Sequence, residues 1–138
     1  QASLTERVLA MDRLTVSSEM TPWRGVVSLS TSDGQSGLAV AARRTRRSRL
    51  PVVDLRGEVV GTIETMQTLL RPEAKIEDLI QSVPMISGDT PVLEALEMLR
   101  SERKPMAIVL GSDTSGVPVG LVTLKDLVEP LTGDLIAW

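Results

Sequence analysis

The residues best suited to chemistry lie near the carboxyl end of the chain, where Thr123-Leu124-Lys125-Asp126 follows an apolar run. A hydroxyl and the free backbone amides at a helix start suit a phosphate group. A carboxylate three residues further on can accept both hydrogen bonds of a ribose diol. The same spacing of Thr and an acid is also typical of a capping box, which needs no ligand. Both interpretations stand on these residues alone.

A second candidate stretch is basic. Five arginines fall within seven residues, namely Arg43, Arg44, Arg46, Arg47 and Arg49. A guanidinium group suits phosphate because its fork makes bidentate contacts. Arg49, which follows Ser48 and leads into an apolar strand pattern, is the strongest candidate. For Arg43, Arg44 and Arg46 the plainer interpretation is a solvated helix end with acidic partners.

Composition narrows the possible functions of this 138-residue chain. With 42% hydrophobic and 24% charged residues, it has the makeup of an ordinary soluble globular protein. It contains no Cys and no His, so the usual zinc sites, a Ser-His-Asp triad and a Cys-His pair are excluded. The net charge of −3 and the lack of aromatic residues other than Trp23 and Trp138 argue against nucleic acid as a partner. Carboxylates remain available for binding magnesium or for acid/base catalysis, so composition narrows the enzyme classes without excluding an enzyme. Taken with the family resemblance described below, the sequence predicts no catalytic residues, no metal site in the protein itself and no enzymatic activity.

The elements that must position these residues recur in the same order. The pattern predicts helix 3–12, strand 26–30, helix 38–47, strands 50–54 and 58–64, and helix 65–71. It then predicts helix 76–81, strand 84–87, helix 91–103, strands 106–110 and 118–124, and helix 125–131. For helix 91–103, Asp89 or Thr90 is expected as the cap and Pro91 as the first helical residue. No apolar run approaches the roughly 20 residues that span a bilayer, and no signal peptide is evident.

This recurrence indicates a duplicated unit. Ser28 matches Ser87 and Gly61 matches Gly120, while Val52 matches Ile108 after adjustments in two loops. One βαββα unit alone leaves a sheet face exposed, and a second copy would cover it. The sequence thus predicts an α+β fold with α/β-type layers, built from tandem βαββα repeats packed with pseudo-twofold symmetry. The expected parts are a linker helix at 1–13 and repeats at 14–72 and 73–138.

Several runs of residues resemble a known family. They are MTP at 20–22, SRLPVVD at 48–54, GEVVGTI at 57–63, DTPVLEALEMLR at 89–100, AIVLG at 107–111 and GLVTLKDLVEPLTGDL at 120–135. In this order and spacing they resemble a CBS-domain pair, also called a Bateman module. More narrowly, they resemble the module of CorC/hemolysin-C-like and cyclin M-type magnesium and cobalt transport proteins.

That resemblance implies a regulatory module that binds an adenine nucleotide, ATP or AMP, in a cleft between the repeats, with Mg²⁺ arriving on a triphosphate. It implies a homodimer formed through the CBS pair. It also implies a covalently attached membrane domain outside this chain, so that the module is the cytoplasmic domain of an inner or plasma membrane protein. The candidate nucleotide-binding residues are Thr21, Ser48, Arg49, Lys104, Thr123 and Asp126.

The first repeat departs from the family pattern. At the positions that match Thr123 and Asp126 it carries Glu64 and Gln67, and a carboxylate in place of the hydroxyl would repel phosphate. Trp23 follows Pro22 where many relatives carry an arginine. We therefore expect one competent nucleotide site per chain. The alternative is a module that has lost its ligand and serves only for dimerisation and scaffolding.

Overall fold

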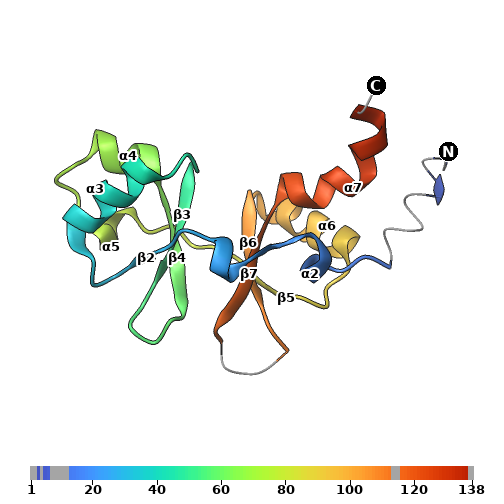
Figure 1. Cartoon of the computed structure of the whole chain (residues 1–138), viewed down its shortest axis with the longest axis horizontal. Coiled ribbons are helices and arrows are strands. Elements are labelled where there is room, and N and C mark those ends of the chain that lie inside the picture. The colour runs from blue at the N-terminus through green and yellow to red at the C-terminus, as the bar shows by residue number, and fades with distance from the viewer. Residues whose placement is uncertain (1–2, 4, 7–12, 113–115, 137–138) are drawn as a thin grey trace. The chain divides into compact units, whose positions relative to one another are not determined.

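The computed structural model describes residues 3, 5–6, 13–112 and 116–136, and these form two compact units (Figure 1). The first, called here the repeat-1 unit, is Gly25–Val83. The second, the repeat-2 unit, joins Gln1–Arg24 to Pro84–Trp138. No helix in the described ranges is long and apolar enough to cross a bilayer.

The repeat-1 unit has the order β-α-β-β-α with a short extra helix. Its elements are β2 Leu29–Ser30, α3 Gly34–Arg44, β3 Arg49–Val53, β4 Val59–Glu64, α4 Thr65–Leu70 and α5 Ile76–Leu79. β2 pairs parallel with β3, and β3 pairs antiparallel with β4. The hairpin turn forms because Asp54 Oδ1 accepts hydrogen bonds from the N–H groups of Arg56 (2.8 Å) and Glu58 (3.0 Å), and Gly57 takes the positive φ of 81°.

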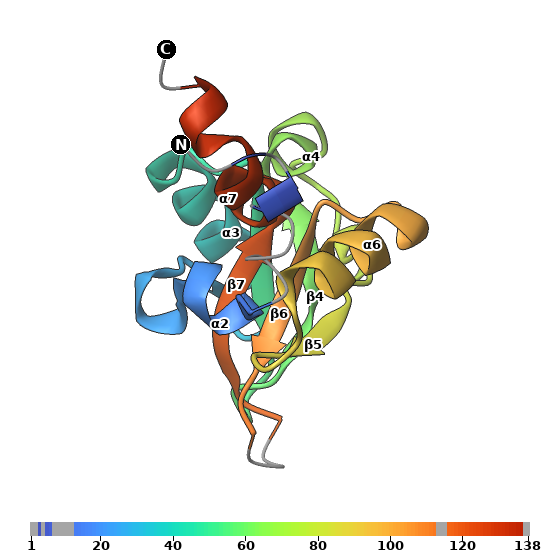
Figure 2. The same ribbon diagram turned by 90° about the vertical axis from the view of Figure 1, so that its right-hand side faces the viewer.

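The repeat-2 unit repeats that order. Its elements are β5 Met85–Ser87, α6 Val92–Glu102, β6 Met106–Leu110, β7 Pro118–Thr123 and α7 Leu124–Ile136, preceded by α2 Val16–Glu19, β1 Thr21–Pro22 and the 3₁₀ turn η1 Trp23–Gly25. The sheet has the order β1-β7-β6-β5. α2, α6 and α7 lie against the sheet (Figure 2). Their residues Val16, Leu99 and Leu127 are buried in one cluster with Val109 of β6 and Val122 of β7. The two units combine helices and sheets in two βαββα motifs, and this confirms the predicted fold class.

Strand pairing corrects the predicted alignment of the copies. Val52 lies between Leu29 and Gly61 in the repeat-1 unit, and Val109 lies between Ile86 and Gly120 in the repeat-2 unit. Val52 therefore corresponds to Val109, not to Ile108. Extending the same register by one residue makes Ser30, rather than Ser28, the counterpart of Ser87. From the first strand to the second, the copies align without a gap, so only the hairpin loop between the second and third strands differs in length.

A linker segment packs against the third strand of each unit. Thr62 of β4 exchanges backbone hydrogen bonds with Gln81 (2.8 and 2.9 Å), and β7 pairs in the same way with β1. A Cβ atom at Gly61 would lie 2.5 Å from the Gln81 carbonyl oxygen, and one at Gly120 would lie 2.8 Å from that of Thr21. Both glycines are therefore required for the close approach of a linker. The segment before each repeat thus packs on the sheet of the other, and the repeat limits 14–72 and 73–138 stay a prediction.

Several element limits differ from the prediction. α3 begins at Gly34 rather than residue 38, because Asp33 accepts a bond from the Ser30 N–H (2.9 Å) and turns the chain into the helix. α7 continues past Pro130 to Ile136, although the proline removes the helical bond to the Asp126 carbonyl. Pro91 is itself the N-cap of α6, in place of Asp89 or Thr90. Most of the predicted helix 3–12, and with it the linker 1–13, lies outside the described residues.

Candidate functional site

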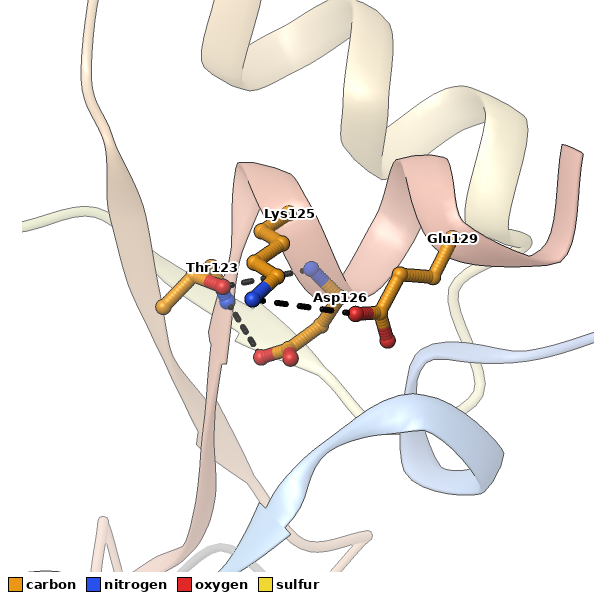
Figure 3. A network of polar contacts seen from close by, with 4 residues as sticks. All are labelled: Thr123, Lys125, Asp126 and Glu129. Carbon is orange, nitrogen blue, oxygen red and sulfur yellow. Dashed lines mark hydrogen bonds and ion pairs between the residues drawn. The ribbon is translucent and has the colours of Figure 1, made fainter. Parts of the chain in front are cut away.

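The junction of β7 and α7 holds the strongest candidate site. β7 ends at Thr123, and α7 begins at the next residue. The Thr123 N–H donates to Asp126 Oδ2 (2.9 Å), and the Asp126 N–H donates to Thr123 Oγ1 (3.2 Å), as Figure 3 shows. These two bonds form the capping box that the spacing predicted as one of its two interpretations. The cap holds the hydroxyl and the carboxylate in fixed positions on a half-buried surface.

Two further candidates lie at the same end of this sheet. Thr21 in β1 lies opposite Leu121 of β7, two residues before Thr123. Lys104 precedes β6, whose first residue, Met106, lies opposite Thr123. The chain reaches this position through Arg103, whose left-handed φ of 55° ends α6. The structure therefore brings Thr21, Lys104, Thr123 and Asp126 to one end of the repeat-2 sheet.

Ser48 and Arg49 lie at the corresponding end of the repeat-1 sheet, where its central strand β3 begins. Arg49 lies opposite Glu64, and its Nη2 atom forms an ion pair with Glu64 Oε1 at 3.5 Å. Both side chains are about one-third exposed, at 34% and 32%. The Ser48 carbonyl accepts a bond from the Thr65 N–H at 2.9 Å. The arginine nearest to a predicted phosphate role is thus already paired with a carboxylate of its own unit.

The two units differ at their strand-to-helix junctions. Within the described residues, the side chain of Glu64 forms no capping hydrogen bond with α4, whereas its counterpart Thr123 caps α7. Thr65 instead bonds through Oγ1 to the carbonyl oxygens of Arg47 (3.1 Å) and Ser48 (3.3 Å). Of the two junctions, the one between β7 and α7 carries a hydrogen-bonded hydroxyl and carboxylate, and the one between β4 and α4 does not.

The repeat-2 junction offers hydrogen-bond acceptors to a ligand. One oxygen of Asp126 accepts the Thr123 N–H, and a carboxylate retains further acceptor capacity for two hydroxyl groups of a diol. Lys125 forms an ion pair with Glu129 at 4.0 Å, and both side chains are exposed (Figure 3). Among the described residues, no group of three or more acidic side chains is placed to hold a metal ion.

A surface hollow also lies in the repeat-1 unit, between the chain at 27–29 and α3. It is lined by Val27, Ser28, Leu29, Asp33, Ser36, Gly37, Val40, Ala41 and Arg44. None of the predicted site residues belongs to it.

Sequence reasoning did not anticipate that Glu64 pairs with Arg49. A hairpin turn centred on Leu55–Gly57 would place residue 49 opposite residue 63, and the register shift between Val52 and Val53, which the sequence does not signal, places it opposite Glu64.

Comparison with known proteins identifies the class. Residues 73–133 match the model of the CBS domain. The chain aligns with a solved structure, described as the CBS domain of the bacterial CNNM/CorC family Mg²⁺ transporter in complex with ATP, at a TM-score of 0.84 and 24% identity, over 94% of this chain and 95% of that one. A CBS domain protein from Shewanella oneidensis MR-1 aligns with a TM-score of 0.80 and 27% identity, over 88% of this chain and 100% of that one. Over residues 73–133 the chain is therefore similar to the CBS domain, and its fold is that of solved CBS-domain structures.

The curated relatives that the chain matches belong to a narrower group of proteins. The chain is a homologue of the UPF0053 proteins, among them YegH of Escherichia coli K12, at 32% identity over 96% of this chain and 26% of that protein. MG146 of Mycoplasma genitalium is 27% identical over 96% of this chain and 32% of that protein. The chain thus spans about a quarter to a third of these relatives. The predicted resemblance to CBS domains of the CorC type is confirmed.

Proposed function

We propose that this chain is the cytoplasmic regulatory module of a CorC-like magnesium or cobalt transport protein, and that it binds an adenine nucleotide. The observation that carries the proposal is the capping box of Thr123 and Asp126, which holds a carboxylate ready to accept a ribose diol. The similar CBS domain whose structure is described as a complex with ATP supports the same ligand class.

In this proposal the repeat-2 junction supplies most of the binding. Asp126 accepts the two ribose hydroxyls, and Thr123 and the first amides of α7 face a phosphate. Lys104 and Thr21 contribute from the same end of the sheet. Ser48 and Arg49 are proposed as contributors from the first repeat, as the family resemblance implies. Mg²⁺ is proposed to arrive bound to the phosphates of a triphosphate.

The test must separate a ligand role of Asp126 from its cap. Asp126→Asn keeps an oxygen that can accept the Thr123 N–H, but it removes the charge and replaces one acceptor by a donor. Calorimetric titration with ATP, ADP and AMP is expected to give one site per chain in the unaltered protein. Asp126→Asn is expected to weaken binding roughly tenfold to 100-fold, the worth of a hydrogen bond to a charged group.

The matched control is Gln67→Asn, which places the same side chain at the corresponding position of the first repeat. This substitution is expected to leave nucleotide affinity unchanged. Ligand-stripped protein that binds none of the three nucleotides would overturn the proposal. Equal weakening by both substitutions would show that Asp126 has no special role in the site.

The regulatory part of the proposal requires a membrane domain in the same protein. The chain covers only 26% of YegH, which leaves room for one. A nucleotide can control such a domain only if it binds two arrangements of the module with different affinity. Transport assays on the full-length natural protein are expected to show that transport depends on ATP. The Asp126→Asn variant of that protein is expected to show an altered dependence. Transport that does not respond to nucleotide would refute this part.

A second function is supported by one observation. The Arg49–Glu64 ion pair occupies the arginine that was predicted as the phosphate ligand of the first repeat, as expected of a module that serves only as a dimerising scaffold. That function predicts a stable homodimer in light scattering and a melting temperature that does not change in millimolar nucleotide. A melting temperature that rises with ATP concentration would exclude it.

A further inference from the structure

The segment 14–22, called here the strap, lies in the repeat-2 unit although it precedes the first repeat in sequence. Hydrogen bonds hold its first half to the turn between β5 and α6. They run from the Val92 N–H to the Leu14 carbonyl (3.0 Å), from the Val16 N–H to the Thr90 carbonyl (2.9 Å), and from the Ser17 N–H (3.0 Å) and Oγ (2.7 Å) to the Gly88 carbonyl. Val16 is fully buried, so the strap forms part of the core of this unit.

The second half of the strap is held by β7. In β1, Thr21 lies opposite Leu121, and Pro22 lies opposite Gly120. Met20 lies over the same glycine, because a Cβ atom there would be 2.9 Å from the Met20 Cγ and 2.8 Å from the Thr21 carbonyl oxygen. The strap is thus fastened at both ends, and its attachment to β7 requires that Gly120 has no side chain.

The strap contacts both elements that carry the candidate site. α2, its helical part, contacts β7 and α7, and Figure 2 shows α2 beside β7. Val16 shares one buried cluster with Leu127, which directly follows Asp126 in α7. Thr21, itself a candidate nucleotide contact, lies opposite the residue of β7 that is two positions before Thr123. Release of the strap would therefore remove packing from both β7 and α7 next to the site.

The linker between the repeats leads to a junction of different chemistry. Gln81 exchanges backbone hydrogen bonds with Thr62 of β4, and that strand ends at Glu64. In the described chain, the side chain of Glu64 forms no cap on α4. The strap thus lies on the strand that leads to the capped junction of Thr123 and Asp126, whereas the linker between the repeats lies on the strand that leads to the uncapped one.

We propose that the strap couples the nucleotide site to the chain that precedes residue 14. In the docked state Thr21 is held beside the junction, so that one ligand can contact the strap and the junction together. In the released state Thr21 is removed and Val16 leaves the core, so that the same ligand loses contacts. This proposal rests on the proposed function and deepens it, since it names the regulation of that same site.

A ligand can act through the strap only if it binds the docked and released states with different affinity, and the position of Thr21 provides this difference. β1 is an edge strand of its sheet, and such segments can open locally while the rest of the unit stays folded. A ligand that contacts both sides must reduce this opening, and by linkage an open strap must weaken the ligand by the same factor. A domain attached ahead of the strap would then respond to nucleotide without touching it.

Hydrogen exchange with and without saturating ATP tests the coupling. The amides of Val16 and Ser17 report opening of the strap, because both donate to carbonyls of the turn before α6. ATP is expected to slow their exchange on the order of tenfold, a common size for coupling between two sites. The amides of Thr62 and Gln81, which fasten the linker between the repeats, provide the internal control and should keep their exchange rates.

A matched pair of substitutions tests the reverse direction. Gly120→Ala pushes the strap away from β7, and Gly61→Ala places the same methyl group 2.5 Å from the Gln81 carbonyl oxygen in the other unit. Gly120→Ala is expected to speed exchange at Val16 and Ser17 and to weaken ATP binding in calorimetry about tenfold or more. Gly61→Ala should bind ATP as the unaltered protein does. Circular dichroism verifies that both variants are folded.

A milder pair keeps the test decisive if Gly120→Ala does not fold. Ser17→Ala removes the side-chain bond to the Gly88 carbonyl, whereas Ser18→Ala removes a bond of the same length, 2.7 Å, to the Thr15 carbonyl inside the strap. Ser17→Ala should speed strap exchange roughly twofold to tenfold, the usual contribution of one hydrogen bond, and ATP should slow it again. Ser18→Ala should leave the attachment unchanged.

Two results would overturn this proposal alone. One is ATP binding to the unaltered protein that leaves strap exchange unchanged, and the other is an equal loss of ATP affinity in Gly120→Ala and Gly61→Ala. Failure of ATP to bind the unaltered protein would overturn the proposed function and this coupling with it. Calorimetry on the unaltered protein therefore distinguishes the two failures.

Discussion

Replacing Glu64 tests how each strand-to-helix junction contributes to stability. Glu64 precedes α4 without forming a cap within the described chain, but it pairs with Arg49 at 3.5 Å. Glu64→Ala removes the ion pair and adds no cap. Glu64→Thr also removes the ion pair, but it supplies a hydroxyl at the position where Thr123 caps α7. With Gln67 three residues on, the Thr variant completes a capping-box sequence.

The magnitudes follow from the geometry. The ion pair joins two side chains that are about one-third exposed, at 34% and 32%, so it is worth about 0–1 kcal/mol and is screened by salt. A Thr cap is worth about 0.5–2 kcal/mol over Ala. Glu64→Ala should therefore lower the free energy of unfolding slightly. Glu64→Thr should exceed Glu64→Ala by about 1 kcal/mol and equal or exceed the unaltered protein.

Urea unfolding at low and high salt measures both effects. The difference between unaltered protein and Glu64→Ala should shrink as salt rises, because it arises from an exposed ion pair. The difference between the Thr and Ala variants should not change with salt. Hydrogen exchange at the amides of Met66 and Gln67 provides a local measure, since a cap protects the first turn. Equal stability of the two variants, with no added protection, would refute the argument that the junction backbone in β4 and α4 is ready to accept a cap.

Three further changes test the fold and the site. Gly120→Ala should lower the free energy of unfolding by about 1–3 kcal/mol, because the new Cβ would lie 2.8 Å from the Thr21 carbonyl oxygen. Urea unfolding measures this loss, and an unchanged free energy of unfolding would contradict the close packing of the linker. Leu99→Ala, at a fully buried position, should cost about 2–5 kcal/mol in the same assay, and a loss below 1 kcal/mol would place Leu99 outside the core. Glu64→Thr combined with Gln67→Asp should raise nucleotide stoichiometry from one toward two per chain in calorimetry, and an unchanged value would argue that the junction residues do not decide competence.

Much of the fold could be predicted because the strands are short apolar runs between strong turn signals. β3, β4, β6 and β7 all begin and end within about one residue of the predicted ranges, since Asp54 and Gly57 mark one hairpin and polar residues mark the other. β1 could not be predicted in this way. Its two residues carry no periodic pattern, and it exists only because Gly120, distant in sequence, leaves room for its backbone.

The site was predictable in its residue types and less so in its pairings. The spacing of Thr123 and Asp126 predicted both a cap and a ligand role, and the structure adds that the cap is formed. The pairing of Glu64 with Arg49 depends on the register of the hairpin. The alternation of apolar and polar residues along a strand sets that register only after the turn residues are known. A register error of one residue, like the one that matched Val52 to Ile108, is enough to hide such a pair.

The two repeats have diverged most where the backbone places no demand on side-chain type. Inside, large and small residues exchange places at constant volume: the buried i,i+4 pair is Leu38 and Ala42 in α3 but Ala95 and Leu99 in α6. Outside, the first turns of α4 and α7 differ in charge, cap and polarity on the same scaffold. Packing explains why the cores agree, but it cannot explain why α4 is apolar where α7 is charged. We therefore expect functional differences between the copies to reside in these junctions.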